Sequence, residues 1–129
     1  MIDTAIILAA GLGKRMRDFD PIIPKPLIKV NNKPFIQYAI DLLNEIRAKE
    51  IIINVHYKSD EILKFIKNLG QKNIIVSDES DLLLDTGGGI KKIFDIHNID
   101  KSLVLNSDVI WGNSDKELIC LLYTSDAAD

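Results

Sequence analysis

The sequence has little cysteine, little arginine and no long hydrophobic run, and each shortage excludes a class of protein. One cysteine in 129 residues cannot form a disulfide framework within the chain, which fits a reducing compartment. No apolar run approaches the ~18 residues of a transmembrane helix. The run Ala5–Ala10 is also too short for the core of a signal peptide. We therefore expect a cytoplasmic protein without a membrane span.

The charge balance offers no general attraction to polyanions. Sixteen Lys and Arg residues against 19 Asp and Glu residues give a formal net charge of −3, so neither nucleic acid nor an anionic membrane is an expected partner. Only three of the 16 basic residues are arginines, yet Arg15 and Arg17 stand two positions apart directly after a glycine-rich stretch. Because the guanidinium group binds phosphate through two donors at once, this concentration indicates a local anion site.

Strands alternate with helices along the chain. Four short apolar runs lack the period-2 alternation of a half-exposed strand and predict strands covered on both faces. They are Thr4–Ala9, Ile51–Val55, Asn73–Ser77 and Ser102–Asn106. A further short extended piece is expected at Leu27–Val30, before a turn at Asn31-Asn32-Lys33.

The expected helices lie between these strands. Helical spacing of apolar residues predicts them over 34–48, from Ser59 to a stop at Gly70, from Gly87 onward, and from a capping box formed by Ser114 and Glu117. The order predicts an α/β fold with an open, doubly wound, mostly parallel sheet. Ligands of such folds bind outside the carboxyl ends of the strands, where the segment 11–17, Gly87–Gly89 and Asp108 would meet.

The segment after the first strand has the composition of a phosphate cradle. Gly11 and Gly13 let the backbone N–H groups approach an anion closely, and Lys14 and Arg15 follow at once. Lys25 stands between two prolines that restrict its backbone. The pattern is neither a P-loop nor a dinucleotide fingerprint. The alternative interpretation is a tight turn with solvated cations.

At this point the sequence resembles a family. Residues 8–17 (LAAGLGKRMR) and Pro24-Lys25-Pro26-Leu27 are similar to the signature of sugar-1-phosphate nucleotidyltransferases. The segments 86–90 (TGGGI) and 104–109 (VLNSDV) look most like the branch that contains N-acetylmuramate-1-phosphate uridylyltransferases, with mannose-1-phosphate guanylyltransferase-like proteins as close relatives. The resemblance implies an enzyme that joins an NTP to a sugar 1-phosphate and releases pyrophosphate.

The resemblance also implies roles for individual residues. The expected catalytic residues are Arg15, which would clamp the leaving pyrophosphate, and Lys25, which would face the α-phosphate and the sugar phosphate. Asp108 would bind Mg²⁺. The implied substrate-binding positions are Leu8, Ala9, Ala10, Gly11, Gly13, Lys14, Gly87, Gly88 and Asn106. Within that set, Gly87 and Gly88 would leave room for the base.

The chemistry of this reaction agrees with what the sequence lacks. No convincing His/Asp or Cys/His nucleophile pair is present. The attacking group would be a phosphate oxygen that is already anionic, so no general base is required. The main obstacle is the approach of two anions, for which a metal ion, Arg and Lys are suited.

Several interpretations stay open. UTP with N-acetylmuramate 1-phosphate is the expected substrate pair, and GTP with mannose or heptose 1-phosphate is the alternative. A cytidylyltransferase of the same fold acting on phosphocholine is a second enzymatic hypothesis. A non-catalytic nucleotide-binding module is the hypothesis from another class. Trp111 could stack on a sugar or simply pack against the protein.

The last ten residues differ from the rest of the chain. Residues 120–129 contain no Ile, Lys or Asn, which fill 44 of the first 119 positions, and they resemble a translated sequencing adapter. We expect residues 1–119 to be the N-terminal part of a nucleotidyltransferase domain and 120–129 to be a non-native tail. The alternative is a natural, frayed C-terminus. The resemblance places a second metal-binding Asp beyond residue 119, so this segment alone is expected to bind a nucleotide without turning it over.

Overall fold

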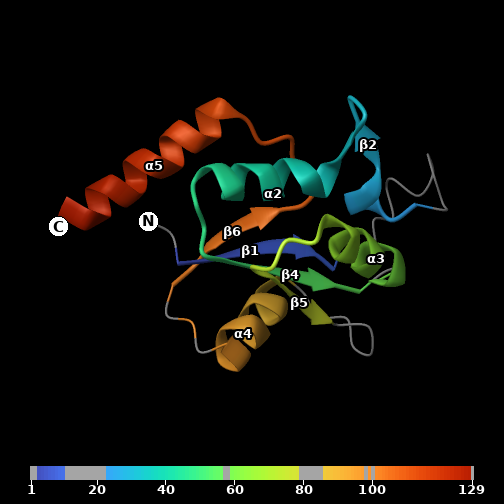
Figure 1. Cartoon of the computed structure of the whole chain (residues 1–129). Helices are drawn as coiled ribbons and strands as arrows, with labels where there is room; N and C mark the ends of the chain where they lie inside the picture. Colours follow the sequence, from blue (N-terminus) through green and yellow to red (C-terminus); the bar gives the residue numbers. More distant parts are fainter. Residues whose placement is uncertain are drawn as a thin grey trace.

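A computed structural model of the chain describes residues 3–10, 23–56, 59–78, 86–97, 99 and 101–128. Its centre is a four-stranded sheet in the order β5-β4-β1-β6, and every neighbouring pair is parallel (Figure 1). The strands are β1 (Thr4–Ala9), β4 (Glu50–Val55), β5 (Ile74–Asp78) and β6 (Leu103–Asn106). The helices are α2 (Phe35–Glu45), α3 (Ser59–Leu69), α4 (Thr86–His97) and α5 (Asn113–Ala128). The predicted α/β fold is confirmed.

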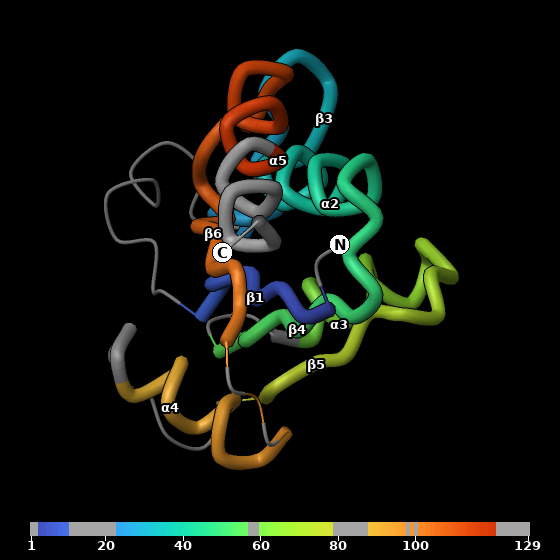
Figure 2. The backbone as a smooth tube through the Cα atoms, turned by 90° about the vertical axis from the view of Figure 1, so that its left-hand side faces the viewer, coloured from blue at the N-terminus to red at the C-terminus, as the bar shows by residue number. Residues whose placement is uncertain are grey.

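Helices cover both faces of the sheet, as a doubly wound fold requires. Side chains of α2, α3 and α5 pack into one apolar cluster with alternate residues of the strands, among them Ala5, Ile7 and Ile53. Ile93 of α4 packs into a second cluster with Ile6 and Ile52. Figure 2 shows the layers edge-on, with α2 and α5 above the sheet and α4 below it. The central strands β1 and β4 are largely buried, which explains their uninterrupted apolar sequences, whereas the apolar residues of the edge strands β5 and β6 are mostly half-buried.

The strand register places all four carboxyl ends at one edge of the sheet. Leu8 of β1 lies opposite Asn54 of β4 and Asn106 of β6. Asn54 in turn lies opposite Ser77 of β5. The chain leaves β1 and β6 at this edge, so the segments that follow them start side by side.

The helix predicted over 34–48 is shorter in the structure. It ends at Glu45, because Arg47 adopts a left-handed backbone with φ of 60°. The Ala48 N–H then donates to the carbonyl of Leu43 at 3.0 Å. This is the hydrogen bond of a Schellman cap, in which glycine usually takes the place held by Arg47. The apolar pattern alone gave no sign of this stop.

The region after Pro24 also differs from the prediction. Leu27 ends a short 3₁₀-helix, η1 (Lys25–Leu27), rather than starting an extended piece. The extended part is a small antiparallel hairpin of β2 (Lys29–Val30) and β3 (Lys33–Pro34). Asn31 and Asn32, with φ of 53° and 65°, form its turn. Two consecutive positive φ values match the type I′ turn that joins hairpin strands tightly.

The start of α5 is capped by a different pair from the predicted Ser114 and Glu117. With Ser114 as its N-cap the helix would begin at residue 115, but it begins two residues earlier, at Asn113, and the Gly112 N–H donates to the Asp115 carboxylate at 2.8 Å. The residue whose carboxylate caps the helix is therefore Asp115, the third residue of α5. The helix continues to Ala128, past the change in composition at residue 120. A non-native tail stays a prediction.

Candidate functional site

The structure joins two residues that sequence reasoning placed in the site. Lys25 Nζ lies 2.7 Å from Asp108 Oδ2, although 83 positions separate them in the chain. Their side chains are 28% and 38% exposed, so both groups are reachable from solvent. A cation and a carboxylate are thus held together where β6 ends.

The backbone around Lys25 is fixed on both sides. Pro24 and Pro26 are buried, and the Leu27 N–H donates to the Pro24 carbonyl at 2.9 Å, closing the turn of η1. The Phe35 N–H donates to the Ile28 carbonyl at 3.0 Å, which ties the segment to the start of α2. The predicted stiffening by the two prolines is therefore accompanied by hydrogen bonds.

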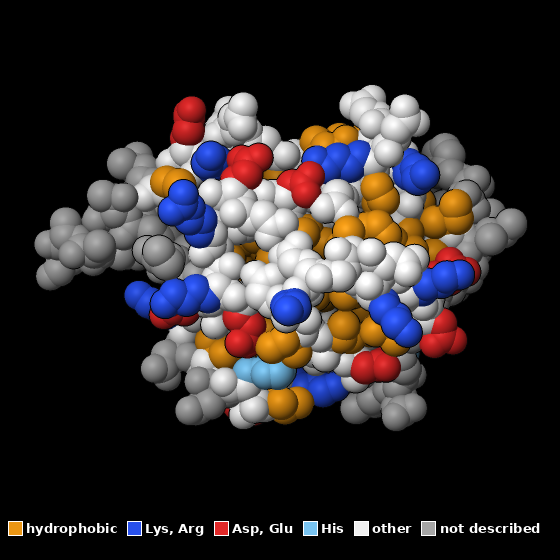
Figure 3. All heavy atoms as spheres, in the orientation of Figure 1, with side chains coloured by type: hydrophobic (Ala, Val, Ile, Leu, Met, Phe, Trp, Pro, Cys, Tyr) orange, Lys and Arg blue, Asp and Glu red, His pale blue; other side chains and the backbone are white. Residues whose placement is uncertain are grey.

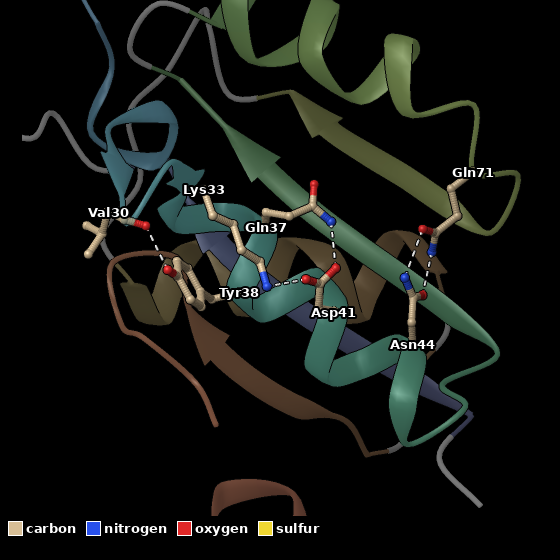
Figure 4. A network of polar contacts seen from close by, with 7 residues as sticks. All are labelled: Val30, Lys33, Gln37, Tyr38, Asp41, Asn44 and Gln71. Atoms are coloured by element: carbon tan, nitrogen blue, oxygen red, sulfur yellow. Dashed lines mark hydrogen bonds and ion pairs between the residues drawn. The ribbon is translucent and has the colours of Figure 1, made fainter. Parts of the chain in front are cut away.

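The hairpin after Lys25 is anchored on the outer face of α2 (Figure 4). The Tyr38 hydroxyl donates to the Val30 carbonyl at 2.7 Å. Lys33 pairs with Asp41, and its ammonium lies 4.4 Å from the centre of the Tyr38 ring. The Gln37 amide donates to the same Asp41 carboxylate at 2.7 Å. These contacts hold the segment that carries Lys25 against a helix of the core.

Asp108 is positioned by the end of β6. The adjacent Ser107 is buried, and its N–H donates to the Leu8 carbonyl at 3.2 Å. The Trp111 indole N–H donates to the Asn106 carbonyl at 3.1 Å, while the ring packs against the α2-side core cluster. Trp111 therefore has the packing role that was one of its two interpretations. The Asn106 side chain is exposed.

The predicted substrate-binding positions of β1 lie at the same edge. Leu8 is half-buried, whereas Ala9 and Ala10 are buried. The Ala9 N–H donates to Asn54 Oδ1 at 2.6 Å. Sequence reasoning missed Asn54, and the available signal was a single amide in the apolar run Ile51–Val55.

The glycines of the TGGGI segment form the first turn of α4. Gly87 and Gly88 lie in the helix, and Gly89 is buried. Lys92 Nζ, one turn further on, donates to the Asp78 carbonyl at 3.0 Å, at the carboxyl end of β5. The middle of α4 is thereby linked to the carboxyl end of β5, at the edge of the sheet where β6 also ends. Gly11, Gly13, Lys14 and Arg15 lie outside the described residues, so their roles stay predictions.

A divalent metal fits Asp108 only in part. The carboxylate oxygen is a ligand that Mg²⁺ prefers, and this ion commonly takes one or two carboxylates with water and substrate phosphates as its other ligands. Within the part of the chain that the structure describes, no group of three or more His, Cys, Asp or Glu side chains could hold a metal. Among the described residues, Asp108 would thus supply a single carboxylate, and water and substrate phosphates would complete the coordination of the ion.

Basic and acidic side chains are interspersed on the face of the molecule shown in Figure 3, and neither sign of charge dominates it. Among the described helices, none is long and apolar enough to cross a bilayer.

The chain is similar to known proteins over most of its length. The family model described as nucleotidyl transferase matches residues 4–127. An N-acetylmuramate alpha-1-phosphate uridylyltransferase of Caulobacter vibrioides is 36% identical over 111 residues, covering 83% of this chain and 46% of the relative. A D-glycero-alpha-D-manno-heptose 1-phosphate guanylyltransferase of Campylobacter jejuni is 38% identical over 109 residues, covering 83% and 48%.

One solved structure is similar to this chain over most of its length. HddC from Yersinia pseudotuberculosis complexed with GMP-PN has a TM-score of 0.72 and 28% identity, over 95% of this chain and 54% of that one. The chain spans about half the length of the relatives it matches. The family match covers nearly the whole chain, and the chain therefore belongs to the nucleotidyl transferase family.

Proposed function

We propose that the full-length protein transfers a nucleotidyl group from an NTP to a sugar 1-phosphate, giving an NDP-sugar and pyrophosphate. The observation that carries this proposal is the pairing of Lys25 with Asp108 at 2.7 Å, beside the end of β1. A cation and a carboxylate at the carboxyl edge of a parallel sheet are suited to phosphoryl transfer, which depends on positioning and charge neutralisation. Family membership and the names of the relatives support the reaction class.

The proposed reaction is an in-line displacement at the α-phosphorus. A bond forms between a phosphate oxygen of the sugar phosphate and this phosphorus. The bond from the phosphorus to the oxygen that bridges to the β-phosphate breaks, and pyrophosphate leaves with that oxygen. The attacking oxygen already carries negative charge, so the protein does not have to remove a proton.

Lys25 and the glycine-rich segment would share the work of neutralising charge. Lys25 exchanges its carboxylate partner for an oxygen of the α-phosphate when the nucleotide binds, because a compact ammonium can re-aim along its flexible stem. Gly13, Lys14 and Arg15 hold the β- and γ-phosphates, with Arg15 gripping the leaving pyrophosphate through two donors. These assignments rest on the position of Lys25 and on the family resemblance.

Mg²⁺ is the proposed cofactor, and Asp108 is the residue that would hold it. When bound, the ion neutralises phosphate charge as the leaving group departs. Release of Asp108 from Lys25 would make the carboxylate available to the ion and the ammonium available to the phosphate. The ion pair would therefore keep the Lys25 ammonium and the Asp108 carboxylate close to the positions in which they would bind the phosphate and the ion.

The proposed substrate pair is UTP with N-acetylmuramate 1-phosphate. The segment 86–90 and the Caulobacter relative support it. The second candidate, GTP with heptose or mannose 1-phosphate, is supported by a guanylyltransferase relative of similar identity. The first pair would give a precursor for the cell wall, made in the cytoplasm.

Release of pyrophosphate from the full-length gene product tests the proposal. Each of the four NTPs is supplied with Mg²⁺ and with N-acetylmuramate, mannose or heptose 1-phosphate, and with phosphocholine. We expect release with UTP and N-acetylmuramate 1-phosphate and none without an acceptor. Release with GTP or CTP and another acceptor would replace the substrate pair. Nucleotide binding by calorimetry without any release would favour the non-catalytic module.

A further inference from the structure

We propose that Asn54 is a positioning residue, which holds the end of β1 in the conformation that binds the nucleotide and acts through the backbone of Ala9. This role rests on the proposed function. The Ala9 N–H donates to Asn54 Oδ1 at 2.6 Å, a contact between residues 45 positions apart. Asn54 would not touch the reacting atoms itself.

The burial of Asn54 is unusual for an amide. The residue is 3% exposed, and Ile51, Ile52, Ile53 and Val55 of the same strand are fully buried. An amide in apolar surroundings is unfavourable unless it forms hydrogen bonds, and an aliphatic side chain would suit this strand better. The contact to Ala9 therefore points to a task other than filling the core.

The contact lies where main-chain pairing of β1 stops. The ladder between β1 and β4 ends at the pair Ala9 and Val55. On the other side of β1, the Ser107 N–H donates to the Leu8 carbonyl at 3.2 Å. The last residues of β1 thus form hydrogen bonds to both neighbouring strands. On the β4 side the acceptor is the Asn54 side chain, so this hydrogen bond can be removed by substitution.

The hydrogen bond between Asn54 and Ala9 matters because the residues that follow Ala9 are the ones proposed to bind the nucleotide. Ala10 is buried directly after the contact, and the Gly11–Gly13 segment follows. Backbone groups that bind a ligand must be held within about 0.5 Å of the productive geometry. Loss of the Asn54 acceptor should therefore weaken the interaction with the NTP and leave the sugar phosphate unaffected.

The test compares Asn54→Leu with Ser77→Ala in the full-length gene product. Leu has the same branching as Asn and no acceptor. Ser77 lies opposite Asn54 on β5 and is 6% exposed, so it controls for the loss of a buried polar group. We expect Asn54→Leu to raise the KM for the NTP at least tenfold and to leave the KM for the sugar 1-phosphate within twofold. Ser77→Ala should change neither.

A purely structural role would give a different pattern. Loss of folded enzyme lowers the apparent kcat and leaves both KM values unchanged. Amide hydrogen exchange of the ligand-free protein adds a readout that needs no turnover, and Ala9 should exchange at least tenfold faster in Asn54→Leu while Ile6 keeps its rate. If Asn54→Leu does not fold, Asn54→Ala takes its place with the same expected changes.

The outcomes separate this role from the proposed function. An active wild-type enzyme whose NTP KM is insensitive to the loss of Asn54, or equally sensitive to Ser77→Ala, would overturn the positioning role alone. A wild-type protein that releases pyrophosphate from no NTP would overturn the proposed function and, with it, the role of Asn54.

Discussion

Lys25 Nζ and Asp108 Oδ2 form an ion pair of 2.7 Å between η1 and the turn after β6. Both side chains keep contact with solvent, and a surface ion pair of this kind contributes only about 0–1 kcal/mol to stability. The pair therefore contributes little to stability, which is compatible with the exchange of partners that the proposed function requires.

The substitution Asp108→Asn should separate stability from activity. We expect a change of at most about 1 kcal/mol in the free energy of unfolding, since only a partly exposed ion pair is lost. Mg²⁺-dependent release of pyrophosphate should be abolished, because the neutral amide is a much weaker ligand for a hard cation. Chemical denaturation and a pyrophosphate assay check the two parts. Activity that survives unchanged would remove Asp108 from the metal site.

The substitution Lys25→Ala should lower kcat by about 10²–10³-fold, which is typical for loss of one group that stabilises charge in the transition state. Lys29→Ala is the matched control, because Lys29 is an exposed cation four residues further along the chain, on β2. Steady-state kinetics of both variants decide the matter. An equal loss in the two variants would indicate a general effect of local positive charge.

The substitution Arg15→Lys should weaken NTP binding by about tenfold, or about 1.4 kcal/mol, because the two-donor fork of the guanidinium is lost while the charge is kept. Arg47→Lys is the control, since Arg47 lies in the turn after α2, at the opposite end of the sheet from Asp108. Titration calorimetry measures both. Equal affinity of wild type and Arg15→Lys would remove Arg15 from the phosphate site.

The substitution Arg47→Gly should stabilise the protein by about 0.5–1 kcal/mol. Arg47 has a φ of 60°, a conformation that costs a residue with a Cβ about 1–2 kcal/mol and costs glycine nothing. Part of this gain is offset by the greater freedom of glycine in the unfolded chain. Lys49→Gly, two residues later and exposed, should destabilise the protein instead. Urea denaturation of both variants gives the comparison, and a destabilised Arg47→Gly would contradict the account of this cap.

The strands show what could be predicted well. β1 and β4 lie within one residue of the predicted runs, because strands buried on both faces require uninterrupted apolar sequences. Helix ends were harder. The stop after Glu45 depends on a left-handed arginine, and the start of α5 depends on the Asp115 carboxylate, so neither follows from apolar spacing.

Contacts between segments that are distant in the chain could not be predicted from the sequence. Asn54 and Ala9 are 45 positions apart, and nothing local to the Ile51–Val55 run indicates which backbone group the amide would meet. Figure 4 shows a second case, in which Asn44 of α2 and Gln71, before β5, exchange two amide hydrogen bonds of 2.7 and 3.1 Å. Such pairs exist only once the parallel sheet has set the register of its strands.

The alternation of strands and helices, the local concentration of glycine and basic residues, and the choice of Lys25 and Asp108 as site candidates were all predictable from the sequence. These properties depend on composition and on the spacing of residues along the chain, and both can be seen without knowing the tertiary structure. The ion pair of Lys25 with Asp108 and the hydrogen bond from the Ala9 N–H to Asn54 are visible only in the folded chain. Such meetings depend on the strand order β5-β4-β1-β6, which brings distant segments to one edge of the sheet.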